Sequence, residues 1–298
     1  MKLSKYLYKA KQKTLKIVIP IRSRLLKILR RTDLETIYFE GGLGSQILAY
    51  IDFLSSPRKV DLSYFRTPPN HSVNGPDIWG WELSRYGIEL NDFSEFEKSK
   101  SFNPWITRRP SSLEFSNSLN HSEKKSLVPN DVKDRLPIDL NNLQRALAKF
   151  DINLDRTITV HIRRGDYERV ASRLVEIDEY TDLLVVLLKD NNLDILFLSD
   201  TDIPQKIQND LYQRFKQNKL KFFSNTDITT HQAHDLMRMS RILITANSTF
   251  SISAGLLSEE NTTVYSPILF FGGKYGYSQS RTFNRYGEFF VMRKRNQP

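Results

Sequence analysis

Two adjacent arginines, Arg163 and Arg164, follow a run of β-branched residues in the string His161-Ile-Arg-Arg-Gly-Asp-Tyr167. The run Thr157–Val160 is typical of a buried strand, and open α/β sheets bind ligands at the carboxyl ends of their strands. A guanidinium group offers a planar fork of N–H donors that matches two phosphate oxygens at once, which lysine cannot do. The pair therefore predicts an anion site, and the diphosphate of a nucleotide-sugar suits it well.

Two further polar clusters come directly after predicted strands. Ser199 and Asp200 end one strand, and Asn247-Ser-Thr-Phe-Ser251 follows another and opens a helix. Hydroxyl and N–H groups at a helix start can cap the helix and also receive a phosphate at its positive end. Because parallel strands place their carboxyl ends at one sheet edge, we expect the clusters to share a pocket. The candidate ligand-binding residues of this half are His161, Arg163, Ser199, Asp200, Asn247, Ser248, Thr249, Phe250 and Ser251.

A glycine-rich segment, Glu40-Gly-Gly-Leu-Gly-Ser-Gln46, lies between a short predicted strand at 36–39 and an apolar helix from about 47 to 54. Glycines there let backbone N–H groups approach a ligand and aim a helix N-terminus at it. Gly42, Gly44 and Gln46 are therefore further candidates for ligand binding. A tight strand-to-helix turn without any ligand is the alternative, because a single glycine loop is a weak motif.

The order of predicted elements favours an α/β fold whose C-terminal half is a doubly wound, parallel, Rossmann-like sheet. Segment 57–137, rich in Ser, Asn and Pro, shows poor periodicity and is expected to form variable loops that recognise an acceptor. We divide the chain into a basic arm (1–34), an N-terminal acceptor-side subdomain (35–150) and a C-terminal nucleotide-sugar-binding subdomain (151–298). The predicted strands of the last part are 157–162, 194–199, 220–224, 241–246 and 262–266, and its helices lie near 178–190, 204–217, 231–240 and 250–258.

The positive charge of the chain is concentrated at its N-terminus. Residues 1–31 contain eleven Lys or Arg and no Asp or Glu, so subtracting those eleven from the net charge of +10 leaves −1 for the remainder. Apolar residues such as Leu3, Leu7 and Ala10 recur there at helical spacing, which is typical of an interfacial helix on an anionic membrane. A solvated basic tail and a nucleic-acid-binding arm are the alternatives. Elsewhere the sequence offers no nucleic-acid motif, and we expect no nucleic-acid partner.

The composition of the chain indicates a globular protein and the kind of compartment in which it works. A chain of 298 residues with 39% hydrophobic content can bury a substantial core, and no segment is apolar over the length that a membrane span requires. The chain has no cysteine, which excludes disulfides and thiolate metal sites and fits a reducing compartment. We expect a cytoplasmic protein, with the arm as a candidate peripheral contact to the inner face of the cytoplasmic membrane.

Four segments in this order resemble the bacterial α-1,2-fucosyltransferases of glycosyltransferase family 11. They are Gly41-Gly-Leu-Gly-Ser-Gln46, His161-Ile-Arg-Arg-Gly-Asp-Tyr167, Phe197-Leu-Ser-Asp200 and Asn247-Ser-Thr-Phe-Ser251. The resemblance extends from about 36 to 267 and implies a GT-B-like arrangement, GDP-β-L-fucose as the donor and inversion at the anomeric carbon. It implies no cofactor and no metal ion. The implied acceptor is the 2-hydroxyl of a glycan, such as a surface polysaccharide or a lipid-linked O-antigen repeat.

The resemblance also implies roles for residues of the arginine motif. Arg163 would clamp the diphosphate of the donor and stabilise the departing GDP, and Arg164 would share that role or brace the loop. His161 would touch the nucleotide or orient the arginines, unless it only closes a strand. Asp166 would hold the arginines, contact the guanine or serve the structure alone, and it is also a candidate general base together with Glu168 and Glu40.

The sequence departs from the family pattern at several places, and one of them is the short segment between Tyr167 and the predicted helix start at Asp178-Glu-Tyr180. Thr201 stands where family members usually carry a second acid after Asp200, and Ile252-Ser253 stands where many carry paired tryptophans. The donor pocket is therefore expected to differ there. Two alternatives stay open: a fucosyltransferase of another linkage, such as α-1,6, and a GDP-sugar-binding or glycan-binding module that has lost catalysis.

Overall fold

The computed structural model describes residues 34–55, 59–66, 80–89, 131–165, 174–189, 192–259, 261–267 and 289–291. The predicted membrane or tail role of residues 1–31 falls outside these ranges, as do the candidate bases Asp166 and Glu168. For Glu40 the structure describes the backbone but not the side chain.

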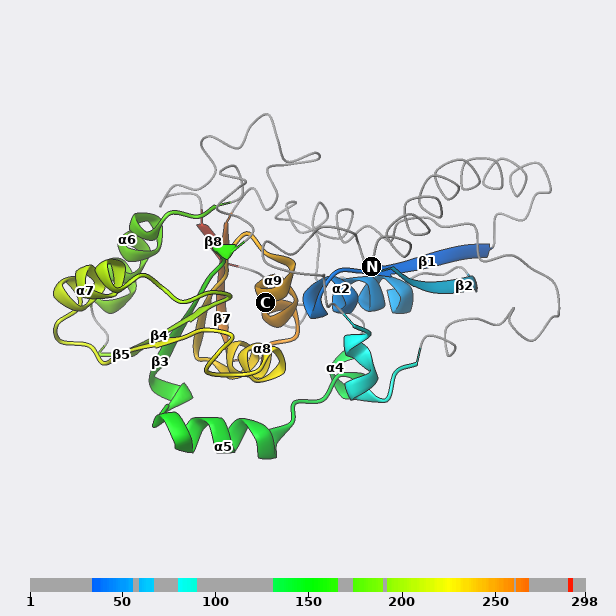
Figure 1. The fold of residues 1–298 in the computed structure, drawn as a ribbon, viewed down its shortest axis with the longest axis horizontal. Helices are drawn as coiled ribbons and strands as arrows, with labels where there is room; N and C mark the ends of the chain where they lie inside the picture. Colours follow the sequence, from blue (N-terminus) through cyan, green and yellow to red (C-terminus); the bar gives the residue numbers. More distant parts are fainter. Residues whose placement is uncertain are drawn as a thin grey trace, which may run out of the picture.

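The larger sheet of the described chain has six strands in the order β5-β4-β3-β6-β7-β8 (Figure 1). Neighbouring strands from β5 to β7 are parallel, and only β8 runs antiparallel, against β7. This confirms the predicted α/β class and parallel C-terminal sheet, whereas β8 was not predicted. The strands are β3 (Thr157–Ile162), β4 (Asp194–Ser199), β5 (Leu220–Phe223), β6 (Ile242–Ile244), β7 (Thr263–Pro267) and β8 (Phe289–Val291).

Helices cover both faces of this sheet, so the doubly wound arrangement is confirmed as well. Alternate residues of β4 face opposite ways: Ile195 and Phe197 pack with one buried cluster, and Leu196 and Leu198 with another. The first cluster includes side chains of α6 and α7, and the second includes side chains of α8 and α9. The helices are α6 (Ile177–Leu188), α7 (Gln205–Arg214), α8 (Thr230–Met239) and α9 (Thr249–Leu256).

A smaller parallel unit, β1 (Leu34–Glu40), α2 (Leu43–Ser55) and β2 (Lys59–Arg66), precedes the large sheet. Two expectations were wrong here. Helix α2 begins at Leu43 rather than near 47, so the glycine turn is shorter than predicted. Strand β2 lies inside the segment expected to form loops, although Val60, Leu62 and Tyr64 carry the alternating pattern of a strand.

Short elements connect the two units. They are η1 (Glu82–Tyr86), α4 (Val132–Arg135) and α5 (Leu140–Phe150), none of which was predicted. Helix α5 is capped by Asp139, whose carboxylate accepts a hydrogen bond from the backbone N–H of Asn142. Within the described ranges, no helix has both the length and the apolar character needed to cross a bilayer.

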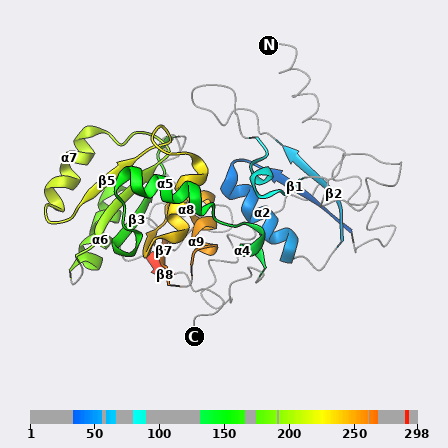
Figure 2. The same cartoon turned by 90° about the horizontal axis from the view of Figure 1, so that it is seen from below.

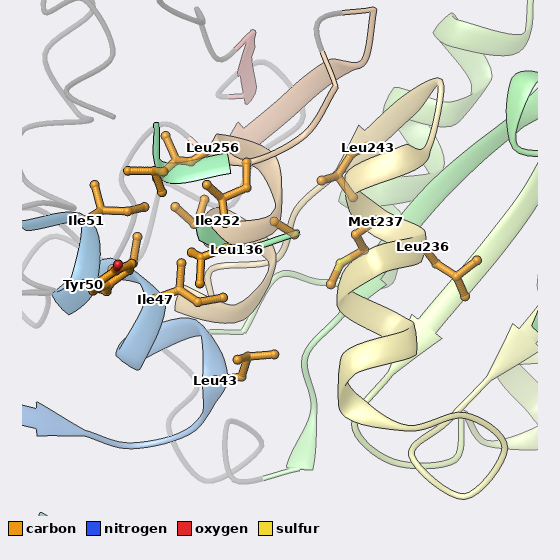
Figure 3. Close-up of a cluster of buried hydrophobic side chains, with 14 of the residues drawn as sticks. Leu43, Ile47, Tyr50, Ile51, Leu136, Leu236, Met237, Leu243, Ile252 and Leu256 are labelled. Atoms are coloured by element: carbon orange, nitrogen blue, oxygen red, sulfur yellow. The ribbon is translucent and has the colours of Figure 1, made fainter. Parts of the chain in front are cut away.

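The two units share one hydrophobic core, in which α2 packs against α9 (Figures 2 and 3). Figure 3 shows Leu43, Ile47 and Ile51 of α2 facing Ile252 and Leu256 of α9. Burial of each such side chain contributes about 1.5–3 kcal/mol. One of the two buried clusters thus includes residues on both sides of the predicted boundary near residue 150. This packing places the start of α2 beside the start of α9.

Candidate functional site

The strand order creates one switch point at the carboxyl edge of the large sheet. The chain runs outward from β3 to β4 and β5, then returns to the other side of β3 with β6. Crossovers on opposite sides of β3 leave a crevice beyond the carboxyl ends of β3 and β6, where open α/β sheets bind their ligands. The segments leaving these strands are 163–165 and 245–248, so the structure brings the arginine motif to the same place as the Asn247–Ser251 motif.

Asp200 at the end of β4 holds the arginine motif in place. Its Oδ2 lies 3.2 Å from Nη1 of Arg163, and its Oδ1 accepts a hydrogen bond of 2.8 Å from the backbone N–H of Arg164. The side chains of Arg163 and Asp200 are 23% and 18% exposed, so both can meet a ligand. A guanidinium has five N–H donors, and the contact with Oδ2 of Asp200 is made by Nη1.

Gly165 is required for this contact. Its backbone has φ of +21°, and a Cβ at this position would lie 2.2 Å from Oδ2 of Asp200. No side chain fits at that distance, so the carboxylate of Asp200 approaches the loop only because residue 165 is glycine. Gly165, the glycine of the HIRRGDY string, thus leaves the space that the carboxylate of Asp200 occupies.

His161 lies under this loop with only 3% of its surface exposed. Burial first, and the charge of Arg163 second, lower the pKa of His161 from 6.5 to about 3. The imidazole is therefore neutral at physiological pH and adds no charge to the anion site. Its ring packs edge-on against Phe250, with the ring centroids 5.5 Å apart, so His161 links β3 to the first turn of α9.

The Asn247–Ser251 segment forms the N-terminus of α9, as predicted. Ser248 is the N-cap, and its Oγ accepts a hydrogen bond from the backbone N–H of Phe250. Ser251 is fully buried and bonds back to Ala246 through its hydroxyl. Asn247, Ser248 and Ser251 are all buried, and the side chains of Ser248 and Ser251 shape the turn through their hydrogen bonds to its backbone. The partly exposed Thr249 and Phe250 are left to meet a ligand.

The N-terminus of α2 meets the N-terminus of α9 at this point. The hydroxyl groups of Ser45 and Thr249 lie 3.0 Å apart, and both residues are partly exposed. Each helix start carries unpaired N–H groups and the positive end of a helix dipole. Ser45 was not singled out from the sequence, although it lies inside the glycine-rich segment.

The other residues of the glycine segment have structural tasks. A Cβ on Gly44 would lie 2.4 Å from the Cα of Phe250, so Gly44 allows α2 to approach α9. Gln46 is fully buried; its amide nitrogen donates to the carbonyls of Gly41 and Gly80, and its amide oxygen accepts from the N–H of Glu82. These hydrogen bonds give the buried side chain of Gln46 a bracing role in the turn before α2, and its predicted contact with a ligand stays a prediction. Gly42 remains in the turn before α2.

Ser199 is also mainly structural. It is buried, and its Oγ accepts a long hydrogen bond of 3.4 Å from the N–H of Thr201. Beyond it lies a depression of about 290 Å³, lined by Asp202, Ile203, Gln205, Gln208, Phe222, Phe223, Ser224 and Asp227. Among the described residues no group of three or more His, Asp or Glu side chains could hold a metal ion.

Comparisons with known proteins give only distant likenesses. No family model matches the chain, and no curated protein matches it in sequence. POFUT1 in complex with GDP is 12% identical, with a TM-score of 0.41 over 78% of this chain and 97% of that one. The fucosyltransferase NodZ from Bradyrhizobium is 10% identical, with a TM-score of 0.41 over 88% and 100%. The ADP-heptose lipopolysaccharide heptosyltransferase II of E. coli is 10% identical, with a TM-score of 0.38 over 77% and 89%.

Proposed function

We propose that this chain is an inverting glycosyltransferase with a GT-B-like arrangement, similar to the α-1,2-fucosyltransferases of family 11. It transfers L-fucose from GDP-β-L-fucose to the 2-hydroxyl of a glycan acceptor. The observation that carries the proposal is the position of Arg163, which Asp200 holds at the switch point of the sheet, beside the segment that begins α9.

This arrangement suits a diphosphate that leaves with negative charge. As the bond to the sugar breaks, charge accumulates on the departing GDP, and Arg163 together with the N–H groups at the start of α9 can stabilise it. The same groups bind the ground state less strongly, because its charge is smaller, so they lower the barrier. In metal-dependent transferases a divalent cation supplies this positive charge; we expect this enzyme to use Arg163 instead, with support from Arg164.

The depression that follows β4 and β5 is a candidate place for the nucleoside part of the donor. The depression lined by Asp202, Gln205, Gln208 and Asp227 begins two residues after Asp200. Its volume of about 290 Å³ is at the lower end of ligand pockets, which suits one part of a donor such as the base. Carboxylate and amide groups in its wall can accept hydrogen bonds from a guanine edge.

The proposed acceptor follows from the family resemblance, and the proposed cellular location follows from the positive charge of residues 1–31. We propose a surface polysaccharide or lipid-linked O-antigen repeat as the acceptor, reached at the inner face of the cytoplasmic membrane through the basic residues 1–31. The general base is one of Asp166, Glu168 and Glu40, or the transition state is dissociative and needs little base assistance.

The decisive experiment is turnover by the full chain. We expect GDP release from GDP-fucose in the presence of a glycan acceptor, and a product with one added deoxyhexose by mass spectrometry, whose linkage NMR then assigns. Arg163→Ala should lower the rate by about 10² to 10³, as loss of a charge-stabilising donor does elsewhere. Arg156→Ala is the matched control. Arg156 is exposed and lies directly before the amino end of β3, whereas Arg163 follows its carboxyl end.

Two results would replace the proposal. Product linked through a hydroxyl other than position 2 would identify a fucosyltransferase of another linkage. A chain that binds GDP but releases none from any GDP-sugar would be a binding module, for which Thr201 in place of the usual second acid is the supporting feature.

A further inference from the structure

His234 on α8 is a buried histidine that the proposed mechanism does not use. It is 0% exposed, and α8 lies beside α9 (Figure 1). Its Nε2 lies 3.1 Å from the hydroxyl of Ser253, and its ring centroid lies 5.4 Å from that of Phe250. His234 therefore contacts α9 at two places, both within its first five residues.

The hydrogen bonds around Ser253 determine which nitrogen of His234 carries the proton. The hydroxyl of Ser253 donates to the carbonyl of Phe250 at 2.9 Å. A hydroxyl has one hydrogen, so when Ser253 donates to Phe250 its oxygen accepts from His234, and we assign the proton of the imidazole to Nε2 on this ground. Through Ser253, His234 is thus connected to the backbone of Phe250 as well as to its ring.

His234 stays neutral in this environment. Burial, followed by the positive charges of Arg238 and Arg85 and by His161, lowers its pKa well below 6.5. Asp235, the next residue on α8, is also buried and lies 3.4 Å from Nη2 of Arg85 and 3.8 Å from Nη1 of Arg238, so these arginines are already paired. A neutral imidazole can donate one hydrogen bond in a fixed direction, which suits it to hold Ser253.

Phe250 lies between two neutral histidines. Its ring contacts His234 on the side of α8 and His161 on the side of β3. The Nδ1 atom of each histidine is buried without a hydrogen-bond partner, and each such atom costs about 1–3 kcal/mol. Leucine or methionine would fill the site of His234 without this cost, so packing alone does not account for a histidine there.

We propose that His234 is a positioning residue for the anion site: it fixes the first turn of α9, with Thr249 and Phe250, against His161. The proposal rests on the proposed function, because it assigns His234 a role in receiving the diphosphate of the donor. The residue itself touches no ligand. It acts through Ser253 and Phe250, and it holds the N–H groups of the first turn in the direction that the phosphate needs.

The test is calorimetric titration of the full chain with GDP and, as a phosphate-free probe, with guanosine. His234→Phe keeps an aromatic ring against Phe250 but removes the donor to Ser253, and we expect GDP to bind about tenfold more weakly, as loss of one hydrogen bond implies. Guanosine affinity should change less, because guanosine has no phosphate to meet α9. His234→Gln retains an N–H donor and should restore most of the GDP affinity.

Ser253→Ala tests the same hydrogen bond from the other side. It should weaken GDP binding to a similar extent, and the double variant His234→Phe/Ser253→Ala should be no weaker than either single one. Met237→Leu is the matched control on α8, since Met237 is a buried core residue and this exchange conserves volume; GDP affinity should not change.

The outcomes separate this proposal from the proposed function. If Arg163→Ala weakens GDP binding while His234→Phe and Ser253→Ala bind GDP as the wild type does, the role of His234 is wrong and the function stands. Equal losses for GDP and guanosine would also overturn it, because they indicate a general structural effect. If the wild-type chain binds no GDP, both proposals fail.

Discussion

Nη1 of Arg163 and Oδ2 of Asp200 form an ion pair of 3.2 Å between the ends of two neighbouring strands. The two residues are separated in sequence by α6 and β4, and they meet because β3 and β4 are parallel neighbours. The pair ties the guanidinium of Arg163 to the end of β4, while the second oxygen of Asp200 accepts a hydrogen bond from the backbone N–H of Arg164. Asp200 was expected to contact the donor, and its contacts show that it also positions the arginine.

Asp200→Asn should weaken GDP binding by about tenfold. The amide can still accept the N–H of Arg164, but its NH₂ group cannot pair with the guanidinium of Arg163. Since both side chains are partly exposed, the free energy of unfolding should fall by only about 1 kcal/mol or less. Calorimetry with GDP and urea unfolding measure the two effects. Asp210→Asn, at an exposed position of α7, is the control; an affinity equal to the wild type in Asp200→Asn would refute the positioning role.

Gly165→Ala should reproduce the binding defect of Asp200→Asn. The added Cβ would lie 2.2 Å from Oδ2 of Asp200, so this oxygen must shift, and we expect the shift to weaken its contact with Arg163. GDP titration checks this prediction. Gly80→Ala is a matched control, because a Cβ there meets no atom within 4 Å. Unchanged GDP binding by Gly165→Ala would mean that Asp200 can move without loss of the site.

Gly44→Ala should destabilise the protein by about 1–3 kcal/mol, the usual cost of overpacking. Replacing a helical glycine by alanine otherwise stabilises a helix by about 1 kcal/mol, so the sign of the change reveals whether packing decides. We expect packing to decide, because the new Cβ would lie 2.4 Å from the backbone of Phe250. Urea unfolding measures the change, and a gain in stability would show that α2 and α9 can separate at no cost.

Stability should fall as the pH drops below about 6.5, in part because of His161. Its pKa is about 3 in the folded protein and 6.5 in the unfolded chain, so the unfolded chain binds more protons between these values. The stability gained by keeping His161 neutral is fully present above pH 6.5 and is lost progressively as the pH falls toward 3. At pH 5.5 it should already be smaller by about 1.4 kcal/mol. Urea unfolding of wild type and His161→Leu at pH 7.5 and 5.5 tests this, since the variant should lose that part of the pH dependence.

Deletion of residues 1–31 should abolish binding to vesicles that contain anionic lipid while GDP affinity is retained. The segment carries eleven positive charges and no acidic residue, each worth about 1 kcal/mol near an anionic surface. Co-sedimentation with and without phosphatidylglycerol provides the measurement. Vesicle binding that survives the deletion would place the membrane contact elsewhere, and tight, salt-sensitive binding of the intact chain to nucleic acid would favour the alternative partner.

The sequence alone was sufficient for the parallel strands of the C-terminal sheet. Strands 157–162 and 194–199 were predicted with their observed bounds, and the other parallel strands within two residues. Such strands are buried on both faces, so they appear as apolar runs bounded by polar turns. The convergence of Arg163, Asp200 and Thr249 on one edge also followed from the sequence, because parallel strands end at the same edge.

The N-terminal elements were less accessible to sequence reasoning. Strand β2 was assigned to loops because its neighbours are rich in Ser and Pro, and α2 was started too late because glycines were taken as turn residues. In the structure Gly44 lies within α2, and glycine is needed there because the backbone of Phe250, 206 positions later in the chain, approaches it closely. Local propensity cannot reveal such a partner.

The amino-acid sequence by itself determined which residues carry charge and which segments form the parallel strands of the large sheet, and hence the sheet edge at which an anion site is predicted. Only the tertiary structure decided which distant residues meet: the side chain of Gln46 bonds to the backbone before α2, Gly165 leaves room for Asp200, and His234 contacts Ser253 of α9. The physical reason is that strand formation depends on side chains close together in sequence, whereas these roles depend on contacts between helices and loops that only the packed core brings together.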